Sequence, residues 1–335
     1  MSARQVLVTD YTWDNTDAEA EVLAEAGAEL VLAKTGDPDE LASLVVDADA
    51  ILTCFKQVPA DVIRAGPRLQ VVGRYGIGVD NIDVAEATRL GILVTNVPAY
   101  CLDEVAEHAL GLLLGLARNI PAYNASVRDG KWDLKAGRPL FRVAGQTLGV
   151  MGFGKIGQTL AAKASGFGVK VVAYDPFMDA ERIRSRGVEP SDLDDLLARS
   201  DLVSLHVPLT DATRHLINES RLRSMKPTAF LVNTSRGGII DLDALARALR
   251  EGWIAGAGLD VFEPERLPRD HPLLALPNLV ATPHVAFYSE ESVLELERKA
   301  ARNIADVLLG RLPESVVNRE VLELPRWQHL VGAGC

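Results

Sequence analysis

Short apolar runs alternate with amphipathic stretches of helical period along most of the chain. This alternation is typical of parallel strands joined by crossover helices. In the first part of the chain the pattern predicts strands at 5–9, 29–33, 50–53, 71–73 and 93–95 and helices at 17–26 and 38–45. A second series predicts strands at 147–151, 169–174, 201–205, 229–232, 254–259 and 279–281 and helices at 155–167 and 242–251. We therefore expect an α/β protein with two doubly wound parallel-sheet domains.

Two long helices are predicted outside these series. Residues 103–118 are strongly apolar, and Asp103 at their start is a suitable N-cap residue. A segment rich in Gly, Lys, Arg and Trp follows at 128–142. After Tyr288 a last amphipathic stretch runs to Leu309 and ends at Gly310, a residue type that often terminates helices. Because this helix follows the second series, it is placed to return to the first domain.

Composition and charge restrict the partners and the location. A length of 335 residues gives each of two domains a sizeable core. With a net charge of −11 and scattered Lys and Arg, neither nucleic acid nor an anionic membrane is expected as a partner. The apolar run at 6–8 is too short for a signal peptide or a membrane span. The cysteines (Cys54, Cys101 and Cys335) are far apart and no side chains have metal-ligand spacing, so we expect no disulfide framework, no metal and a cytoplasmic location.

A glycine-rich turn is the strongest single signal. The residues Gly152-Phe153-Gly154-Lys155-Ile156-Gly157 fit the pattern GxGxxG, with a predicted strand before them and a predicted helix after them. In that context the turn lets a pyrophosphate approach the N-terminus of the helix. Asp175 ends the next predicted strand, where a carboxylate binds ribose hydroxyls and repels a 2′-phosphate; Pro176 rather than a cation follows it. The sequence therefore predicts NAD as the cofactor, in preference to NADP.

Three ionisable residues follow predicted strands of the second domain: Arg236, Glu265 and His284. The carboxyl ends of parallel strands meet at one edge of a sheet, so we expect the three side chains to converge beside the cofactor. Histidine can protonate the alkoxide that hydride transfer produces, or act as the base in the reverse direction. A carboxylate such as Glu265 would orient the ring, and the planar guanidinium of Arg236 would hold a substrate carboxylate.

The first domain supplies a candidate site for the anionic substrate. Directly after a predicted strand, the glycines beside Ile77 would let backbone amides approach an anion, and Gly76, Ile77 and Gly78 are the candidate donors. Lys56 ends the preceding strand region, and Tyr75 begins the loop. The substrate side chain would be read by residues 54–56 with Tyr75, Tyr100 and Phe287, and these residues do not identify one compound.

Together these motifs resemble the D-2-hydroxyacid dehydrogenase family. The matching segments are 76–83, 152–157 with Asp175, 206–209, 233–238, 259–265 and 282–284. The resemblance implies a Rossmann NAD-binding domain at 101–287, inserted into a flavodoxin-like substrate domain at 1–100 and 288–335. It also implies (R)-2-hydroxy acid stereochemistry and a homodimer formed through the arm at 120–142. It assigns to the cofactor site, besides the glycine turn, Asp175 and Pro176, the residues Val105, His206, Val207, Pro208, Thr213, Thr234 and Asp260.

Within that family, residues 282–292 are similar to the C-terminal-binding protein branch, which typically has Trp where this chain has Phe287. Two alternatives to a 2-hydroxyacid dehydrogenase therefore stay open. One is an NAD(H)-sensing, corepressor-like binding protein. The other is a dehydrogenase that acts on a phosphonate or phosphite-type oxyanion. The intact set of Arg236, Glu265 and His284 favours an enzyme.

Overall fold

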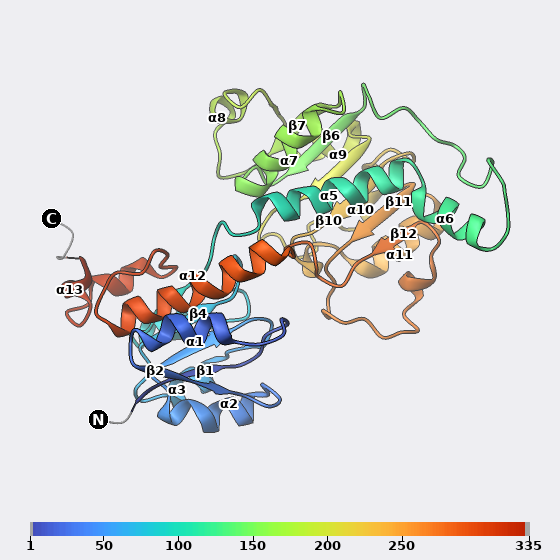
Figure 1. Cartoon of the computed structure of the whole chain (residues 1–335). Helices are drawn as coiled ribbons and strands as arrows, with labels where there is room; N and C mark the ends of the chain where they lie inside the picture. The colour runs from blue at the N-terminus through green and yellow to red at the C-terminus, as the bar shows by residue number, and fades with distance from the viewer. Residues whose placement is uncertain (1–2, 332–335) are drawn as a thin grey trace. The chain divides into compact units, whose positions relative to one another are not determined.

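The structure is a computed structural model that describes residues 3–331. By its internal contacts the chain divides into Met1–Tyr100 with Ser289–Cys335, here called the N-terminal unit, and Cys101–Tyr288, here called the central unit. Each unit is built on one parallel sheet (Figure 1), so the predicted α/β class is confirmed.

The sheet of the N-terminal unit has the strand order β2-β1-β3-β4-β5, which is the flavodoxin-like order. Its strands are β1 (Arg4–Val8), β2 (Ala28–Leu32), β3 (Ala50–Thr53), β4 (Val71–Arg74) and β5 (Leu93–Thr95). Its helices are α1 (Asp17–Ala24), α2 (Pro38–Leu44), α3 (Ala60–Ala65), α4 (Val84–Arg89), α12 (Glu290–Leu308) and α13 (Gln328–Val331). Helices α1 and α12 cover one face, and α2 and α3 cover the other (Figure 1).

Helix α12 joins the N-terminal unit after the chain has passed through the central unit. It begins with a capping box, in which Ser289 and Ser292 each accept the other's backbone amide. One face buries a stripe of apolar residues against α1 and β4. The helix ends just before Gly310, which has φ +72°. The sequence pattern had placed this final helix correctly, and the structure shows that it packs on the sheet formed by the first hundred residues.

The central unit contains a seven-stranded sheet of order β12-β11-β10-β9-β6-β7-β8. The strands are β6 (Thr147–Met151), β7 (Lys170–Tyr174), β8 (Glu189–Pro190), β9 (Leu202–Leu205), β10 (Phe230–Asn233), β11 (Gly256–Leu259) and β12 (Leu279–Ala281). The order reverses between β6 and β9, which is the switch point of a dinucleotide-binding sheet. The helices are α5 (Leu102–Ala117), α6 (Ile120–Arg128), α7 (Lys155–Ser165), α8 (Ala180–Arg184), α9 (Leu193–Arg199), α10 (Glu219–Ser224) and α11 (Leu242–Glu251).

Two apolar cores hold the helices of the central unit on this sheet. One joins α5 and α7 to β6 through residues such as Leu113, Leu160 and Val150. The other joins α9 and α11 to the sheet through residues such as Leu196 and Leu245. The cores include Leu205 and Val232, which lie at or next to the carboxyl ends of β9 and β10, where the loops begin.

The predicted N-cap of α5 is wrong. Cys101 occupies the cap position, and Asp103 lies in the first turn, where its carboxylate is 2.8 Å from Lys163 Nζ on α7. A carboxylate in the first turn is stabilised by the partial positive charge of the helix N-terminus and here also by an ion pair. The residue type therefore marked the start of the helix without capping it.

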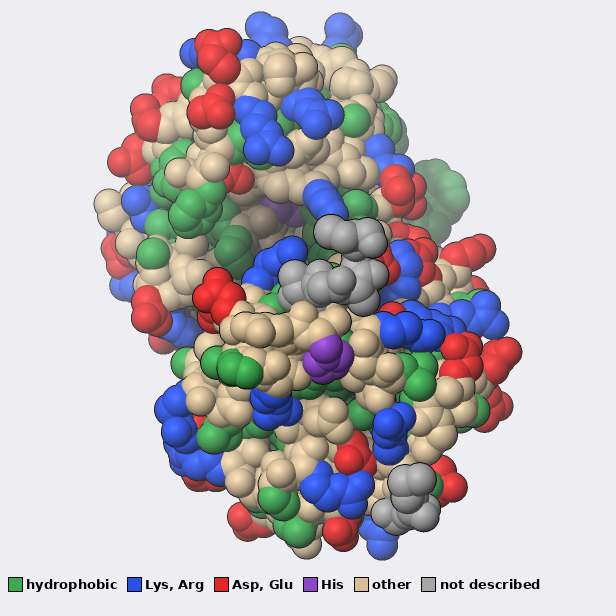
Figure 2. Space-filling model, turned by 90° about the vertical axis from the view of Figure 1, so that its left-hand side faces the viewer, with side chains coloured by type: hydrophobic (Ala, Val, Ile, Leu, Met, Phe, Trp, Pro, Cys, Tyr) green, Lys and Arg blue, Asp and Glu red, His purple; other side chains and the backbone are tan. Residues whose placement is uncertain are grey.

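Acidic and basic side chains are interspersed on the face drawn in Figure 2. Within residues 3–331, no helix is long and apolar enough to cross a membrane. Over the same residues, no group of His, Cys, Asp or Glu side chains is arranged to hold a metal ion. Cys54 is buried in the N-terminal unit, whereas Cys335 lies outside the described residues.

Candidate active site

The predicted catalytic residues follow neighbouring strands of the central sheet. Arg236 follows β10, Glu265 follows β11 and His284 follows β12, and these three strands are adjacent and parallel. The glycine turn follows β6 in the same parallel sheet. Since the strands run in one direction, all four loops leave from one edge of the sheet.

His284 and Glu265 are in direct contact. The distance between His284 Nδ1 and Glu265 Oε1 is 2.5 Å, and the histidine side chain is 18% exposed. An ionised carboxylate only accepts, so Nδ1 carries the hydrogen, and Nε2 is the ring nitrogen that can exchange a proton with a ligand. This is the arrangement of an acid–base histidine whose orientation and imidazolium form are supported by a carboxylate.

The backbone of His284 is held in an uncommon conformation by Asp260. His284 has φ +56°, in the left-handed region, and its amide donates to the Asp260 carbonyl at 2.7 Å. The fully buried Asp260 carboxylate accepts from the amides of Val285 and Ala286, both at 2.9 Å, and from Thr282 Oγ1 at 2.6 Å. One buried side chain therefore fixes the whole segment that carries His284.

His108 on α5 completes this network. Its Nε2 lies 2.9 Å from Thr282 Oγ1 and 3.7 Å from Asp260 Oδ1. In the sequence, His108 is marked only by its place within the predicted helix at 103–118. Because the Thr282 hydroxyl donates its one hydrogen to Asp260, His108 Nε2 donates to Thr282 Oγ1.

Arg236 is positioned by its own loop. Its Nη1 donates to the Ser235 carbonyl at 2.8 Å, and its carbonyl accepts from Asn233 Nδ2 at 2.8 Å. Asn233 Oδ1 also accepts the Ser235 amide at 3.0 Å, so the fully buried Asn233 ties the turn after β10 together. The guanidinium is thereby held at the edge of the sheet, where it can present its fork to a carboxylate.

The glycine turn has the shape that a dinucleotide requires. A Cβ on Gly152, which has φ +92°, would lie 2.6 Å from the His206 backbone, and a Cβ on Gly157 would lie 2.2 Å from the Gly152 carbonyl. In contrast, a Cβ on Gly154 would meet nothing within 4 Å. Gly154 also precedes α7 without any side-chain cap. Close backbone contacts within the protein thus require glycine at positions 152 and 157. The space beside Gly154 fits a pyrophosphate at the N-terminus of the helix.

Asp175 lies directly beside this turn. Its Oδ2 accepts the Phe153 amide at 2.8 Å, and its Oδ1 accepts the Phe177 amide at 2.8 Å. These bonds fix the carboxylate between the turn and the exposed segment of Pro176 and Phe177. A carboxylate oxygen can accept more than one bond, so Asp175 retains capacity for ribose hydroxyls.

Other residues assigned to the cofactor occupy the loops after β9 and β10. Thr234 Oγ1 is buried and has no hydrogen-bond partner in residues 3–331, which fits a site completed by a ligand.

His206 Nε2 lies 2.9 Å from Ser204 Oγ, and burial lowers the pKa of His206 to about 4, so the ring is neutral at neutral pH. Thr213 Oγ1 donates to the Pro208 carbonyl at 2.6 Å and shapes the loop after β9. Val105 and Val207 are buried.

The N-terminal unit holds the predicted anion loop after β4. The Gly76 amide donates to the Arg74 carbonyl at 3.0 Å, so within the loop this amide is already used. The amides of Ile77 and Gly78 have no acceptor in the described part of the chain, and they are the better candidate donors. Lys56 Nζ lies 3.4 Å from Asp37 Oδ1.

Sequence reasoning missed residues that organise these loops. Asp10 accepts the amides of Cys54 at 3.0 Å, Phe55 at 2.7 Å and Lys56 at 3.2 Å. An aspartate directly after a strand was the available signal. Glu19 was also missed, because a glutamate in an amphipathic helix is usually exposed, whereas this one is fully buried.

Comparison with known proteins identifies the family. The sequence model of the D-isomer specific 2-hydroxyacid dehydrogenase, NAD binding domain, matches residues 110–286. The chain is 45% identical over 293 residues to a glyoxylate reductase of Thermofilum pendens, covering 85% of this chain and 86% of that protein. It is 43% identical to a D-3-phosphoglycerate dehydrogenase of Methanocaldococcus jannaschii, covering 94% of this chain and 59% of the relative.

A solved structure extends this similarity. D-lactate dehydrogenase from Aquifex aeolicus, complexed with NAD and lactic acid, has a TM-score of 0.83 and 29% identity, covering 92% of this chain and 96% of that one. The fold and the site thus define a dinucleotide-dependent oxidoreductase. The chain belongs to the D-isomer specific 2-hydroxyacid dehydrogenase family, and NAD is the cofactor of its central unit.

Proposed function

We propose that the protein catalyses reversible, NAD-linked interconversion of a 2-oxo acid and an (R)-2-hydroxy acid. The observation that carries the proposal is the 2.5 Å contact between His284 and Glu265, on a segment fixed by the buried Asp260. NADH, held by the glycine turn and Asp175, would supply the hydride for the carbonyl carbon during reduction. His284 Nε2 gives its proton to the carbonyl oxygen, and Glu265 stabilises the imidazolium before transfer. Arg236 holds the substrate carboxylate.

We further propose that the N-terminal unit is the substrate domain and that the amides of Ile77 and Gly78 bind an anionic group of the substrate. Two neighbouring backbone donors suit a carboxylate, because each of its oxygens can accept more than one hydrogen bond. Tyr75 and Gly76 then serve to shape the loop rather than to donate to the ligand. Lys56 remains available to a second anionic group on a larger substrate.

Glyoxylate and hydroxypyruvate are the substrates we consider first. The curated name of the Thermofilum relative, glyoxylate reductase, supports a small 2-oxo acid. The fixed Asp175 beside the exposed Pro176 supports NAD in preference to NADP, since a 2′-phosphate would meet a carboxylate and no adjacent cation. The complete catalytic set is unnecessary for a sensor, so we place the corepressor-like role second.

We also propose a homodimer in a reducing cytoplasm. Helix α6 has no buried residue, and the arm that continues from it exposes Trp132 and Leu134 by 86% and 82%. Large apolar side chains exposed in one segment are typical of an interface. The location rests on the wide spacing of the cysteines in the sequence, which favours a reducing compartment.

Oxidation of NADH with glyoxylate, hydroxypyruvate, pyruvate and phenylpyruvate tests the proposal. We expect turnover with at least one of these acids, and a fall of about 10²–10⁴ in rate for His284→Ala with NADH binding kept. Silence with all four acids and tight NADH binding would refute the 2-oxo acid assignment. Reduction of NAD with phosphite would then support the oxyanion alternative.

A further inference from the structure

Two carboxylates are buried between α1 and α12, behind the predicted substrate loop. Glu19 on α1 is fully buried, and Glu297 on α12 is 8% exposed. Neither carboxylate forms an ion pair within residues 3–331. Buried carboxylates without cations are costly, so a role beyond packing is expected of them.

Glu19 connects two loops of the N-terminal unit. Its Oε1 accepts from the hydroxyl of Tyr75 at 3.0 Å and from Nε1 of Trp13 at 3.2 Å. The rings of Trp13 and Tyr75 also meet edge to face, with centroids 4.9 Å apart. Tyr75 begins the substrate loop, and Trp13 lies in the loop between β1 and α1. One carboxylate oxygen thus anchors both aromatic side chains.

Both the side chain and the backbone of Tyr75, the first residue of the substrate loop, are held by hydrogen bonds. Tyr75 is 1% exposed, and its amide donates to the Thr53 carbonyl at 2.8 Å. Ile77 and Gly78 follow two and three residues later. With the Tyr75 side chain fixed by Glu19 at one side, and the Ile77 carbonyl bound by Asn96 Nδ2 at 2.6 Å at the other, the two donor amides have a defined position.

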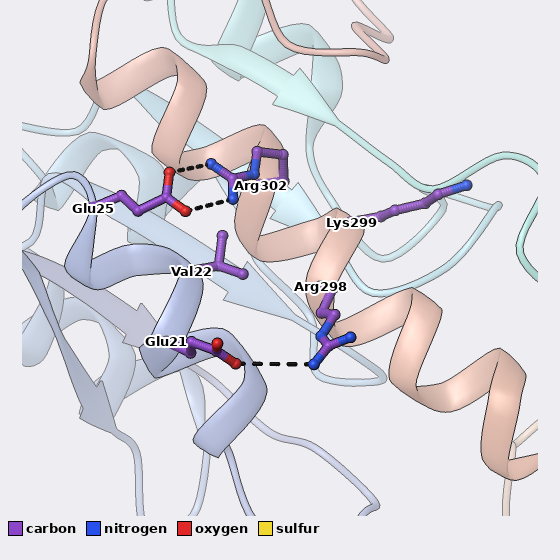
Figure 3. Close-up of a pocket in the computed structure, with 6 residues that line it drawn as sticks. All are labelled: Glu21, Val22, Glu25, Arg298, Lys299 and Arg302. Atoms are coloured by element: carbon purple, nitrogen blue, oxygen red, sulfur yellow. Dashed lines mark hydrogen bonds and ion pairs between the residues drawn. The ribbon is translucent and has the colours of Figure 1, made fainter.

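On the exposed side of α1 and α12, the acidic side chains of α1 lie close to arginines of α12. There, Glu25 forms a two-point ion pair with Arg302 at 2.6 and 2.8 Å, and Glu21 lies 3.9 Å from Arg298 (Figure 3). These residues line an open hollow of about 340 Å³. The cations of α12 are thus directed to the surface carboxylates, and the inner carboxylates are left without such a partner.

Burial is the main cause that raises the pKa of Glu19, and Asp17 on α1 raises it further, whereas the Tyr75 and Trp13 donors lower it. Burial also raises the pKa of Glu297 to about 7, with Glu19 as the second cause and Arg298 as an opposing one. From the loop after β4, Tyr75 faces the pair as a neutral donor, because burial and then Glu19 raise its pKa. Burial is thus the main cause of the raised pKa of each of the two carboxyls.

We propose that Glu19 is a positioning residue for the substrate loop. The inference rests on the proposed role of Ile77 and Gly78 as donors to a 2-oxo acid. Because Glu19 holds both the Tyr75 hydroxyl and the ring nitrogen of Trp13, the loop that begins at Tyr75 is preformed for the substrate.

Three variants test the role of Glu19 with glyoxylate, or with whichever acid the wild type reduces. Glu19→Gln keeps the side-chain shape and removes the charge; we expect KM to rise by about tenfold, as for loss of one charged hydrogen bond, with little change in kcat or in NADH affinity. Tyr75→Phe should raise KM by a similar factor, and KM of the double variant should be no higher than that of either single variant. Glu21→Gln, on the exposed side of α1, is the matched control and should leave KM unchanged.

The outcomes separate this inference from the proposed function. If the wild type reduces no 2-oxo acid, the proposed function fails, whatever the variants do. If the wild type is active and Glu19→Gln has the KM of Glu21→Gln, the positioning role is refuted. Equal losses in KM, kcat and NADH affinity would also refute it, since they indicate a general structural defect.

Discussion

At the scale of single residues, the candidate acid–base histidine depends on a carboxylate that the reaction does not use. Asp260 accepts four bonds from the segment of Thr282 to Ala286, counting its carbonyl, and His284 in this segment adopts a left-handed conformation. A non-glycine residue in that region is strained by about 1–3 kcal/mol and persists where the surrounding bonds determine it. The hydrogen bonds of Asp260 therefore determine the backbone conformation of His284 and the position of its ring.

Asp260→Asn should lower kcat by about 10- to 100-fold and also lower Tm, because an amide presents a donor to groups that need an acceptor. NADH affinity should change much less than kcat. Thr282→Val removes one of the donors and is the milder matched variant. Steady-state kinetics and thermal unfolding measure both effects. Wild-type kcat in Asp260→Asn would show that the loop holds its shape without this carboxylate.

Asp175→Ala should weaken discrimination against NADP. The variant removes the negative charge that a 2′-phosphate would meet, and it also frees the Phe153 and Phe177 amides that Asp175 now binds. We expect the ratio of kcat/KM for NADH over NADPH to fall by about tenfold or more, the effect of one repulsive charge in partly buried surroundings. A wild type that prefers NADPH would contradict the assignment of Asp175.

At the scale of elements, the sequence predicted the strands and helices that have a clear pattern of hydrophobic residues. The strands at 50–53, 93–95, 147–151 and 279–281 and the helix at 242–251 have their predicted bounds. Long apolar runs and capped amphipathic helices are local properties, and the family motifs supply the order of loops at the edge of the sheet. Short elements such as β8 and α10 were not predicted, because two to six residues carry too little pattern and are fixed by packing.

The candidate site divides in the same way. Arg236, Glu265, His284 and the glycine turn were found because each stands in a motif. The Asp260 network and the Glu19 contacts were not found, because they join residues far apart in sequence through buried hydrogen bonds. Glu19 and Tyr75 are 56 positions apart. Nothing in a helix that contains several acidic residues distinguishes the one that turns inward.

The glycine turn permits a prediction about one element with two opposite readouts. Gly157→Ala would bring a methyl group 2.2 Å from the Gly152 carbonyl. We expect overpacking to lower the free energy of unfolding by about 1–3 kcal/mol or more, which is measured as a large fall in Tm. Gly154→Ala meets no atom of the protein, so Tm should fall little. Its methyl group would enter the space assigned to the pyrophosphate, and NADH affinity should fall about tenfold or more. Unchanged NADH affinity in a folded Gly154→Ala variant would move the cofactor away from this turn.

At the scale of the whole molecule, the arm after α5 is the segment whose exposure the single chain does not explain. Ile120, Trp132 and Leu134 are 57%, 86% and 82% exposed, although burial of such side chains is favourable by about 25 cal/mol per Å². The proposed homodimer accounts for them. Because a partner that binds only the folded state adds to its stability by mass action, Tm should rise with protein concentration.

Trp132→Ser combined with Leu134→Ser should convert the dimer into a monomer, since the two most exposed large apolar side chains of the arm are then lost. Sedimentation equilibrium gives the mass, and the concentration dependence of Tm should disappear with the dimer. Phe177→Ser is the matched control: it removes an aromatic residue that is 93% exposed outside the arm, so the mass should stay that of the wild type. A dimer that persists without Trp132 and Leu134, or a wild type that is monomeric at all concentrations, would show that these side chains are exposed for another reason.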